Sequence, residues 1–329
     1  MGSFESIQDS GLKTILVTGG GGFIGTNLVK YLADSGCQIR VLDNLSLCEE
    51  EDLKKLWSQG SGVLSMDLII GDIRDQDVVS QAVKGVDAVV HLAAHTSVVE
   101  SLENPKEDWD VNVNGTLNIL EACRRNGVSK FIFASSNAAV GEQTHPIDYS
   151  RVPQPLSPYG ASKLAGEAFC SAYYHSFGLK TVSLRFANCY GPYSEHKPSI
   201  IPRLLKWAKE EKPFIIYGDG NQSRDFIHVD DVCQAICLAL MANIDSYGSV
   251  FQIGTGIETS INNLAESIRQ IAGNRSEIIH EPEKKGEVKR NFSDITKART
   301  MLGFEPKIKL GEGLGKLWRS YLANVKQEP

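Results

Sequence analysis

Several features that would narrow the class of this protein are missing from its 329 residues. No apolar run approaches the ~20 residues of a membrane-spanning helix, and the N-terminal stretch "MGSFESIQDSG" lacks the apolar segment of a secretory signal. Basic residues are not in surplus, since the net charge is −6, which argues against a general nucleic-acid or anionic-membrane surface. The seven cysteines are odd in number and form no Cys-x-x-Cys pair, which disfavours disulfides or a metal site. We expect a cytoplasmic protein with reduced thiols and no metal.

The first half of the chain alternates short apolar runs with amphipathic helical patterns. Strands that alternate with helices predict parallel βαβ units with right-handed crossovers. Near-continuous apolar strands indicate a sheet that is covered on both faces. We therefore expect an α/β fold with a doubly wound, Rossmann-type parallel sheet. The predicted strands are 14–20, 38–44, 64–73, 87–94, 130–136 and 180–188, and the predicted helices include 75–84, 105–126 and 158–177.

The C-terminal part has a different pattern, because proline and glycine interrupt it in "GPYSEHKPS", "EPEKKGE" and "GFEPKIKL". Such residues break regular elements and favour turns. Helices are still expected near 200–210, 260–272 and 311–324. We predict a smaller and more irregular second α/β lobe.

The stretch "TGGGGFIG" lies between the first predicted strand and the first predicted helix. Its glycines, at 19, 22 and 25 among others, let the chain turn tightly and let a pyrophosphate approach N–H groups at the helix N-terminus. Asp43 lies 18 positions (43 − 25) after Gly25, at the end of the second predicted strand, where a carboxylate binds an adenosine ribose. A carboxylate there repels a 2′-phosphate, so the combination predicts NAD rather than NADP. A glycine-rich turn without a ligand is the alternative for the loop alone.

Tyr159 and Lys163 are four positions apart in "SPYGASKLAGEAF". On a helix they share a face, so the Lys163 ammonium, together with a nicotinamide cation, would lower the pKa of the Tyr159 phenol. A tyrosine tuned in this way is a general base for an alcohol whose carbon loses hydride. Tyr-x-x-x-Lys pairs are common on helix surfaces. The pair gains weight from the glycine loop and from the strand end "ASSNAAVG", where Ser135 and Ser136 offer hydroxyls with little bulk.

Together these motifs resemble the extended short-chain dehydrogenase/reductases, in the nucleotide-sugar (UDP-hexose) 4-epimerase/dehydratase group. The resemblance runs from about residue 13 to 325, and further motifs that carry it are "GDI" (71–73), "HLAA" (91–94), "NVNGT" (112–116), "RFANCYGP" (185–192), "SRDFIHVDD" (223–231) and "GTG" (254–256). It implies an NAD-binding Rossmann domain of 12–188 and 222–255, a sugar-nucleotide lobe of 189–221 and 256–329, and a flexible tail of 1–11.

The resemblance also implies roles for individual residues. Tyr159 is the base, Lys163 orients it, and Ser136 hydrogen-bonds the sugar hydroxyl that is oxidised. The implied cofactor-binding residues are Gly19, Gly22, Phe23, Ile24, Gly25, Asp43, Asn44, Asp72, Ile73, Leu92, Ala93, Ala94, Asn112, Ser135, Tyr159 and Lys163. The implied substrate-binding residues are Thr96, Ser136, Tyr159, Asn188, Arg224 and Arg290.

Three of these assignments have alternatives. Asp72 could receive the adenine amine or cap the helix that follows it. Arg224 suits a phosphate or a ribose because its planar fork bonds oxygens in a fixed geometry, but it could instead pair with one of the nearby aspartates, Asp225 or Asp230. Related proteins usually carry an arginine in the segment that matches "EKKGEVKR". Here Lys284 or Lys285 could take the role given to Arg290.

The resemblance implies a shared first step, in which Tyr159 removes the 4-hydroxyl proton of a sugar while hydride leaves carbon 4 for NAD. A 4,6-dehydratase then needs an Asp-Glu pair beside the serine, but Asn137 and Ala138 follow Ser136. We therefore predict an NAD-dependent 4-epimerase of a UDP-hexose, UDP-N-acetylhexosamine or UDP-hexuronate, acting through a 4-keto intermediate. A nucleotide-sugar dehydratase of unusual type, for example by 5,6-elimination, and a non-catalytic NAD-binding module are the alternatives.

Some positions depart from the pattern of related epimerases. Ala138 and Val140 replace a threonine-like residue and a tyrosine, which removes a hydroxyl and opens space near the sugar. Asn291 matches a gate position, and its intermediate size does not exclude N-acetyl sugars. Thr96 offers no charge in its loop. The identity of the hexose is therefore left open.

The resemblance further implies a homodimer. The helices at 105–126 and 158–177 would pair with their copies into a four-helix bundle, burying the apolar faces of "LNILEAC" and "AFCSAYYHSF". The alternative is that these faces cover the sheet of their own chain.

Overall fold

The computed structural model describes residues 7–33, 35–58, 66–142, 146–147, 150, 152–245, 247–273, 276–283 and 288–323. Among them, seven parallel strands form one sheet in the order β11-β6-β5-β4-β1-β2-β3. The order reverses between β1 and β4, and in such sheets ligands bind outside the carboxyl ends near this point. The expected Rossmann-type sheet is thus confirmed. Its strands are β1 (Thr14–Thr18), β2 (Gln38–Asp43), β3 (Met66–Ile70), β4 (Ala88–His91), β5 (Lys130–Ser136), β6 (Lys180–Phe186) and β11 (Ser249–Ile253).

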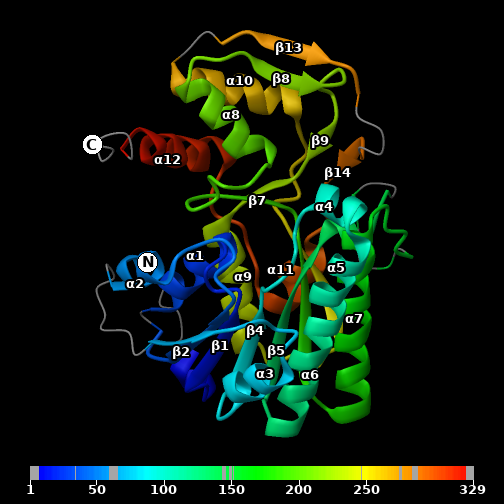
Figure 1. Ribbon diagram of the computed structural model, residues 1–329. Helices are drawn as coiled ribbons and strands as arrows, with labels where there is room; N and C mark the ends of the chain where they lie inside the picture. Colours follow the sequence, from blue (N-terminus) through cyan, green and yellow to red (C-terminus); the bar gives the residue numbers. More distant parts are fainter. Residues whose placement is uncertain are drawn as a thin grey trace.

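Helices cover both faces of this sheet (Figure 1). Because successive side chains of a strand point to opposite faces, Ile15 and Val17 of β1 enter one apolar core and Leu16 enters the other. The first core is closed by α1 (Phe23–Leu32), α2 (Glu50–Ser58), α9 (Val229–Met241) and α11 (Thr296–Leu302). The second is closed by α3 (Gln76–Val83), α6 (Gly115–Asn126) and α7 (Pro158–Phe177).

Local sequence explains where α7 begins and ends. The Ser157 hydroxyl accepts a hydrogen bond from the Gly160 amide at 3.1 Å, and Pro158 occupies the first helical position, where its missing N–H costs nothing. Gly178 ends the helix with a φ of +74°, a conformation that glycine adopts without strain. These caps place Tyr159 in the first turn of α7, beside the end of β5.

The helix expected at 105–126 is interrupted. Helix α4 (Val98–Glu103) precedes α5 (Pro105–Trp109), which continues through a π-helical segment (Asp110–Asn114) into α6. Single π-helical turns of this kind are frequent at functional sites. The segment brings Asn112 inward, where its side chain is buried.

A further apolar cluster lies apart from the sheet and forms the centre of a second lobe (Figure 1). It joins α8 (Ile200–Lys209), α10 (Ile261–Ala272) and α12 (Leu310–Ala323). Short strands complete this part: β7 (Asn188–Tyr190), β8 (Phe214–Tyr217), β9 (Ser223–Arg224), β10 (Phe226–His228), β12 (Thr259–Ser260), β13 (Ile278–Glu281) and β14 (Arg290–Asn291). The expected domain boundaries stay a prediction. Helix α11, which falls within the expected second lobe, packs on strand β11 of the sheet and on helix α9, which covers the sheet.

All seven cysteines are free. In the described part of the chain, no helix combines the length and the apolar character needed to cross a membrane. Nor do the described residues place three or more His, Cys, Asp or Glu side chains together as metal ligands.

Candidate active site

A cavity of about 610 Å³ lies where several strands of the sheet end, and it extends to residues of the second lobe. Most of the residues that the sequence predicts for the site line it, whereas Asn112 and Arg290 do not. Those that do are Gly19, Gly22, Phe23, Ile24, Gly25, Asp43, Asn44, Asp72, Ile73, Leu92, Ala93, Ala94, Thr96, Ser135, Ser136, Tyr159, Lys163, Asn188 and Arg224.

The glycine loop forms a cradle that side chains would fill. Gly19 has a φ of +72°, and a Cβ there would lie 2.7 Å from the amide nitrogen of Ala93. A Cβ on Gly25 would collide with the carbonyl oxygen of Gly19. Gly22 is the N-cap of α1 and provides no side-chain cap, so the first N–H groups of that helix are open to an anion. The loop therefore fits the pyrophosphate of a dinucleotide.

Asp43 ties the glycine loop to the end of β2. Its Oδ2 accepts a hydrogen bond from the Gly21 amide and its Oδ1 accepts one from the Leu45 amide, both at 2.8 Å. The carboxylate is thus held at the cavity wall, at the position predicted for contact with the adenosine ribose. Asp72 also lines the cavity. It is not a helix cap, because Asp75 caps α3 by accepting from the Asp77 and Val78 amides.

Ser136 and Tyr159 meet at the end of β5. Burial raises the pKa of Tyr159 above its usual value, and a hydrogen bond with Ser136 opposes that rise. We expected a lowered pKa. In the protein alone burial dominates, because a phenolate in an apolar environment is costly. The predicted lowering also requires the nicotinamide charge, which belongs to the cofactor and not to the chain.

Lys163 lies one helical turn after Tyr159 and is also buried. Its ammonium donates a hydrogen bond to the carbonyl oxygen of Ala134 at 3.0 Å and lies 5.1 Å from the centroid of the Phe133 ring. Burial lowers the pKa of Lys163 to about 8. The ammonium is therefore anchored to β5, in the same strand that presents Ser136.

Two residues predicted to bind the cofactor have their polar groups engaged within the protein. The Ser135 hydroxyl donates to Glu167, which forms a buried ion pair with Arg185 at 2.6 Å. Asn112 accepts from the His95 amide at 2.8 Å and donates to the His95 carbonyl oxygen at 2.9 Å. It therefore holds the loop that carries Thr96 at the cavity. A cofactor contact for either residue stays a prediction.

Arg290 lies outside the main cavity. Its Nε and Nη2 atoms each lie 2.7 Å from a carboxylate oxygen of Glu258, and it lines a separate cavity of about 300 Å³. Lys284 and Lys285 fall outside the described residues. The role of Arg290 in substrate binding stays a prediction.

Arg224 lines the main cavity beside β7. Its Nη1 donates to the carbonyl oxygens of Ser223 at 2.8 Å and Val288 at 2.7 Å. The Asp225 carboxylate instead accepts hydrogen bonds from Thr255 and from the Gly256 amide. These contacts fix one side of the guanidinium at the cavity wall.

Lys197 and Asn137 are among the lining residues that the sequence analysis did not assign to the site. Lys197 is placed there by the loop after β7, and its ammonium lies 5.4 Å from the centroid of the Phe23 ring. Burial lowers the pKa of Lys197, and no ion pair to this lysine occurs among the described residues. Asn137 donates to Asn291 at 2.9 Å and to Ser293 at 3.0 Å. A lysine in a proline-rich loop and an asparagine after two serines carry no pattern that would have singled them out.

Acidic groups are scarce in the cavity. Among the described lining residues, the carboxylates are those of Asp43 and Asp72. Asp43 is the last residue of β2 and Asp72 follows β3, and the adenosine end of a dinucleotide is predicted to lie there. The polar groups that line the rest of the cavity, around Ser136 and Tyr159, are therefore hydroxyls, amides and cations.

Comparisons with known proteins identify the family. A family model described as the NAD dependent epimerase/dehydratase family matches residues 15–254. The chain is 35% identical over 309 residues to a UDP-glucuronate 4-epimerase of Thermodesulfobacterium geofontis, covering 91% of this chain and 93% of the relative. It is 34% identical over 315 residues to a dTDP-glucose 4,6-dehydratase of Streptomyces niveus, covering 91% and 90%.

A solved structure supports the same family. A UDP-N-acetylglucosamine 4-epimerase from Methanobrevibacter ruminantium, in complex with UDP-N-acetylmuramic acid, superposes with a TM-score of 0.88 at 32% identity, covering 95% of this chain and 99% of that one. The chain belongs to the NAD-dependent epimerase/dehydratase family, within the extended short-chain dehydrogenase/reductases. It is an enzyme of that family and uses NAD, as the glycine loop and Asp43 predict.

Proposed function

We propose that this enzyme is a nucleotide-sugar 4-epimerase that acts on a UDP-hexose, UDP-N-acetylhexosamine or UDP-hexuronate. One observation carries the proposal. The hydrogen-bonded pair of Ser136 and Tyr159 faces the cavity, and no described lining residue beyond Asp43 and Asp72 provides a carboxylate. A 4,6-elimination needs a second acid and base, whereas an epimerisation needs one proton acceptor that returns its proton.

Tyr159, Ser136 and Lys163 each have a separate role in the proposed reaction. The Tyr159 oxygen takes the proton of the 4-hydroxyl, Ser136 holds that hydroxyl in line, and the Lys163 charge stabilises the phenolate. The glycine loop and Asp43 would hold NAD, which would supply the hydride acceptor and donor for carbon 4 of the sugar. For an epimerisation the 4-keto sugar must turn over in the cavity. The small side chain of Ala138 beside Ser136 leaves room for that rotation.

The cationic side chains favour a diphosphate-linked sugar. Arg224 and Lys197 line the same cavity as Asn188 and Phe23. Both cations are partly buried, and a phosphate oxygen beside them would form charge-assisted hydrogen bonds. Relatives whose names specify UDP-glucuronate and UDP-N-acetylglucosamine support a UDP-sugar. The proposal covers hexoses with and without an N-acetyl group, because the intermediate size of Asn291 admits more than one substituent at carbon 2.

A dehydratase of unusual type is the second candidate, since a dTDP-glucose 4,6-dehydratase is among the relatives. Product analysis separates the two. The full-length protein is incubated with UDP-glucose, UDP-N-acetylglucosamine, UDP-glucuronate and their 4-epimers, and the products are identified by NMR and mass spectrometry. An epimer keeps the mass of its substrate, whereas a dehydrated sugar is lighter by one water. Conversion without a change in mass supports the proposal, and a loss of water overturns it.

We also infer a homodimer in the cytoplasm. Val99, Leu102 and Trp109 on the neighbouring helices α4 and α5 are 65%, 61% and 57% exposed, and apolar side chains that form an exposed patch often mark a protein interface. The apolar residues Leu120 of α6 and Cys170 of α7 already pack on their own sheet, so a helical bundle would use the outer faces. The free cysteines suit a reducing compartment. Light scattering on the purified protein tests the dimer.

A further inference from the structure

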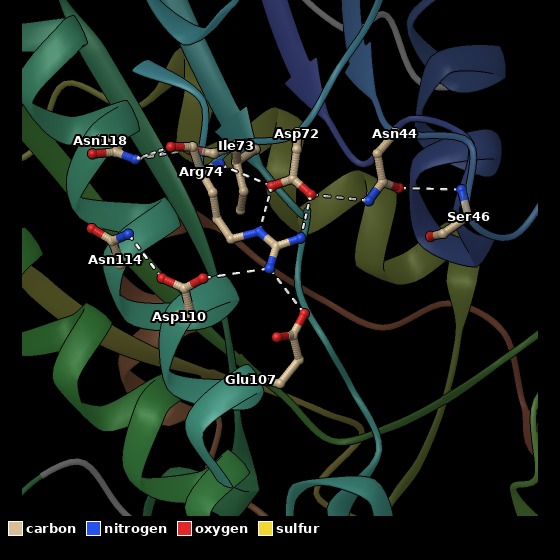
Figure 2. A network of polar contacts seen from close by, with 9 residues as sticks. All are labelled: Asn44, Ser46, Asp72, Ile73, Arg74, Glu107, Asp110, Asn114 and Asn118. Atoms are coloured by element: carbon tan, nitrogen blue, oxygen red, sulfur yellow. Dashed lines mark hydrogen bonds and ion pairs between the residues drawn. The ribbon is translucent and has the colours of Figure 1, made fainter. Parts of the chain in front are cut away.

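We propose that Arg74 is a positioning residue for the cofactor, which fixes the Asp72 carboxylate so that it selects the exocyclic amine of adenine. The inference rests on the proposed contact of Asp72 with the adenine of NAD. It adds residues that neither the family motifs nor the proposed reaction uses: Arg74 itself and its anchors Glu107 and Asp110. Figure 2 shows this network of polar contacts.

Arg74 donates three hydrogen bonds to the carboxylate of Asp72. Its Oδ1 accepts from the backbone amide and from the Nε of Arg74, both at 2.9 Å, and its Oδ2 accepts from the Arg74 Nη2 at 2.8 Å. The remaining contact is longer, because the Asn44 Nδ2 lies 3.4 Å from Oδ2. Oδ2 can therefore accept a hydrogen bond from a ligand, at the cost of only the long contact with Asn44.

The other end of Arg74 is anchored to the helices beside the sheet (Figure 2). Its Nη1 lies 2.9 Å from Glu107 Oε1 of α5 and 3.4 Å from Asp110 Oδ2 of the π-helical segment. The Asn118 amide of α6 donates to the carbonyl oxygens of Ile73 and Arg74, both at 3.1 Å. The loop after β3 is therefore held by three consecutive helical segments.

Every nitrogen of the Arg74 guanidinium donates to a carboxylate. A guanidinium is a planar fork that fixes a carboxylate in two dimensions, whereas a lysine ammonium is a single point charge and leaves the carboxylate free to rotate. Arg74 and Asp72 both line the cavity. The arrangement thus presents an oriented, ionised acceptor to the adenosine end.

This geometry selects one chemical class of base. An adenine presents an amine, which donates to Oδ2. A hypoxanthine presents a keto oxygen at the same place, and a carboxylate repels it. Hydrogen bonds to charged groups are worth more than neutral ones, so we expect the protein to bind NAD about 10- to 100-fold more tightly than nicotinamide hypoxanthine dinucleotide.

The test is a competition on the full-length protein. Labelled NAD is displaced by unlabelled NAD or by nicotinamide hypoxanthine dinucleotide, and the ratio of the two displacement constants gives the preference for the amine. In Arg74→Lys we expect the preference to fall to about threefold or less. The matched control is Arg40→Lys, because Arg40 holds Asp67 at 2.8 Å and the carbonyls of Ala82 and Lys84 outside the cavity. Its preference should equal that of the wild type.

The inference is overturned if the wild type shows no preference, or if Arg74→Lys weakens both dinucleotides equally. The double variant Glu107→Gln, Asp110→Asn provides a second test in case Arg74→Lys does not fold. It leaves the pair of Arg74 and Asp72 in place but removes the anchor, so the preference should fall by about two- to threefold. An unchanged preference there overturns the anchoring role. Turnover of a sugar is not measured, so failure of the proposed epimerase activity would not alter these outcomes.

Discussion

The side chains of Asn137 and Asn291 are joined by a hydrogen bond of 2.9 Å, although 154 positions separate them in the sequence. The bond connects the residue after Ser136 at the end of β5 to β14. Asn137 also donates to Ser293 at 3.0 Å, so both protons of its amide are engaged. The hydrogen bond therefore ties the Asn291 side chain, which lines the cavity, to the end of β5.

Asn137→Ala should loosen this wall. We expect KM for the sugar nucleotide to rise about 3- to 10-fold with a smaller change in kcat, since sugar positioning is affected and Tyr159 is not. The free energy of unfolding should fall by about 1–3 kcal/mol, because the partners of a buried amide lose their hydrogen bonds. Steady-state kinetics and urea unfolding measure the two effects.

The control is Asn126→Ala, in which the lost hydrogen bond goes to the carbonyl oxygen of Ala122 within α6. KM should not change in this variant. An unchanged KM in Asn137→Ala would show that Asn291 is held by other contacts.

Tyr159→Phe tests the proton acceptor. Removal of the phenolic hydroxyl should lower kcat about 10²- to 10⁴-fold, the usual contribution of general acid–base catalysis. Tyr173→Phe is a matched control on the same helix, since that hydroxyl donates to Glu121 at 3.2 Å away from the cavity. Full activity is expected for it. Equal turnover in the wild type and in Tyr159→Phe would refute the catalytic assignment.

Much of the fold follows from local patterns. The apolar run of β5 and the Ser157 and Gly178 caps of α7 are readable in the sequence, because strand burial and helix capping depend on neighbouring residues. The spacing of Tyr159 and Lys163 likewise predicts a shared face. The π-helical segment at 110–114 was not predicted, since nothing in the apolar periodicity of 105–126 marks the extra residue in that turn.

Side-chain hydrogen bonds and ion pairs between residues far apart in the chain could not be predicted from the sequence. The sequence did not indicate that the Ser135 hydroxyl donates to Glu167, whose other partner, Arg185, is opposite Ser135 in the strand pairing of β5 and β6. Arg290 binds Glu258 in the same way. Such pairs depend on the strand register and on which helix covers the strand. A charged residue in the sequence does not indicate which partner it will meet.

The charge of Lys163 should set the alkaline limit of activity. Burial lowers its pKa to about 8, so its ammonium loses the proton as pH rises through that value and the phenolate loses support. We expect kcat/KM to fall above about pH 8. Lys163→Arg keeps the charge at all these pH values, so its remaining activity should lack this decline. A decline at the same pH in both proteins would assign the limit to another group.

Unfolding measurements provide a second test of Lys163. The pKa in the folded protein, about 8, is below the usual value of 10.5, so the unfolded state binds more protons between these values. Stability contributed by this group therefore rises with pH from about 8 to 10.5. The difference in unfolding free energy between pH 9.5 and pH 7.5 should be larger in the wild type than in Lys163→Met. Equal differences would show that burial does not lower this pKa.

Lys197 should bind the diphosphate of the substrate. It is a partly buried cation in the cavity, and the described residues provide no carboxylate as its ion-pair partner. A charge-assisted bond to a phosphate oxygen would stabilise both groups. In Lys197→Met we expect the affinity for UDP to fall about 10- to 100-fold, because one bond between charged groups is lost. The affinity for uridine, which carries no phosphate, should stay the same.

Calorimetric titration of UDP and of uridine measures the two affinities. The control is Lys206→Met, at an exposed position of α8. If UDP and uridine weakened equally, Lys197 would shape the pocket and would not bind the phosphates.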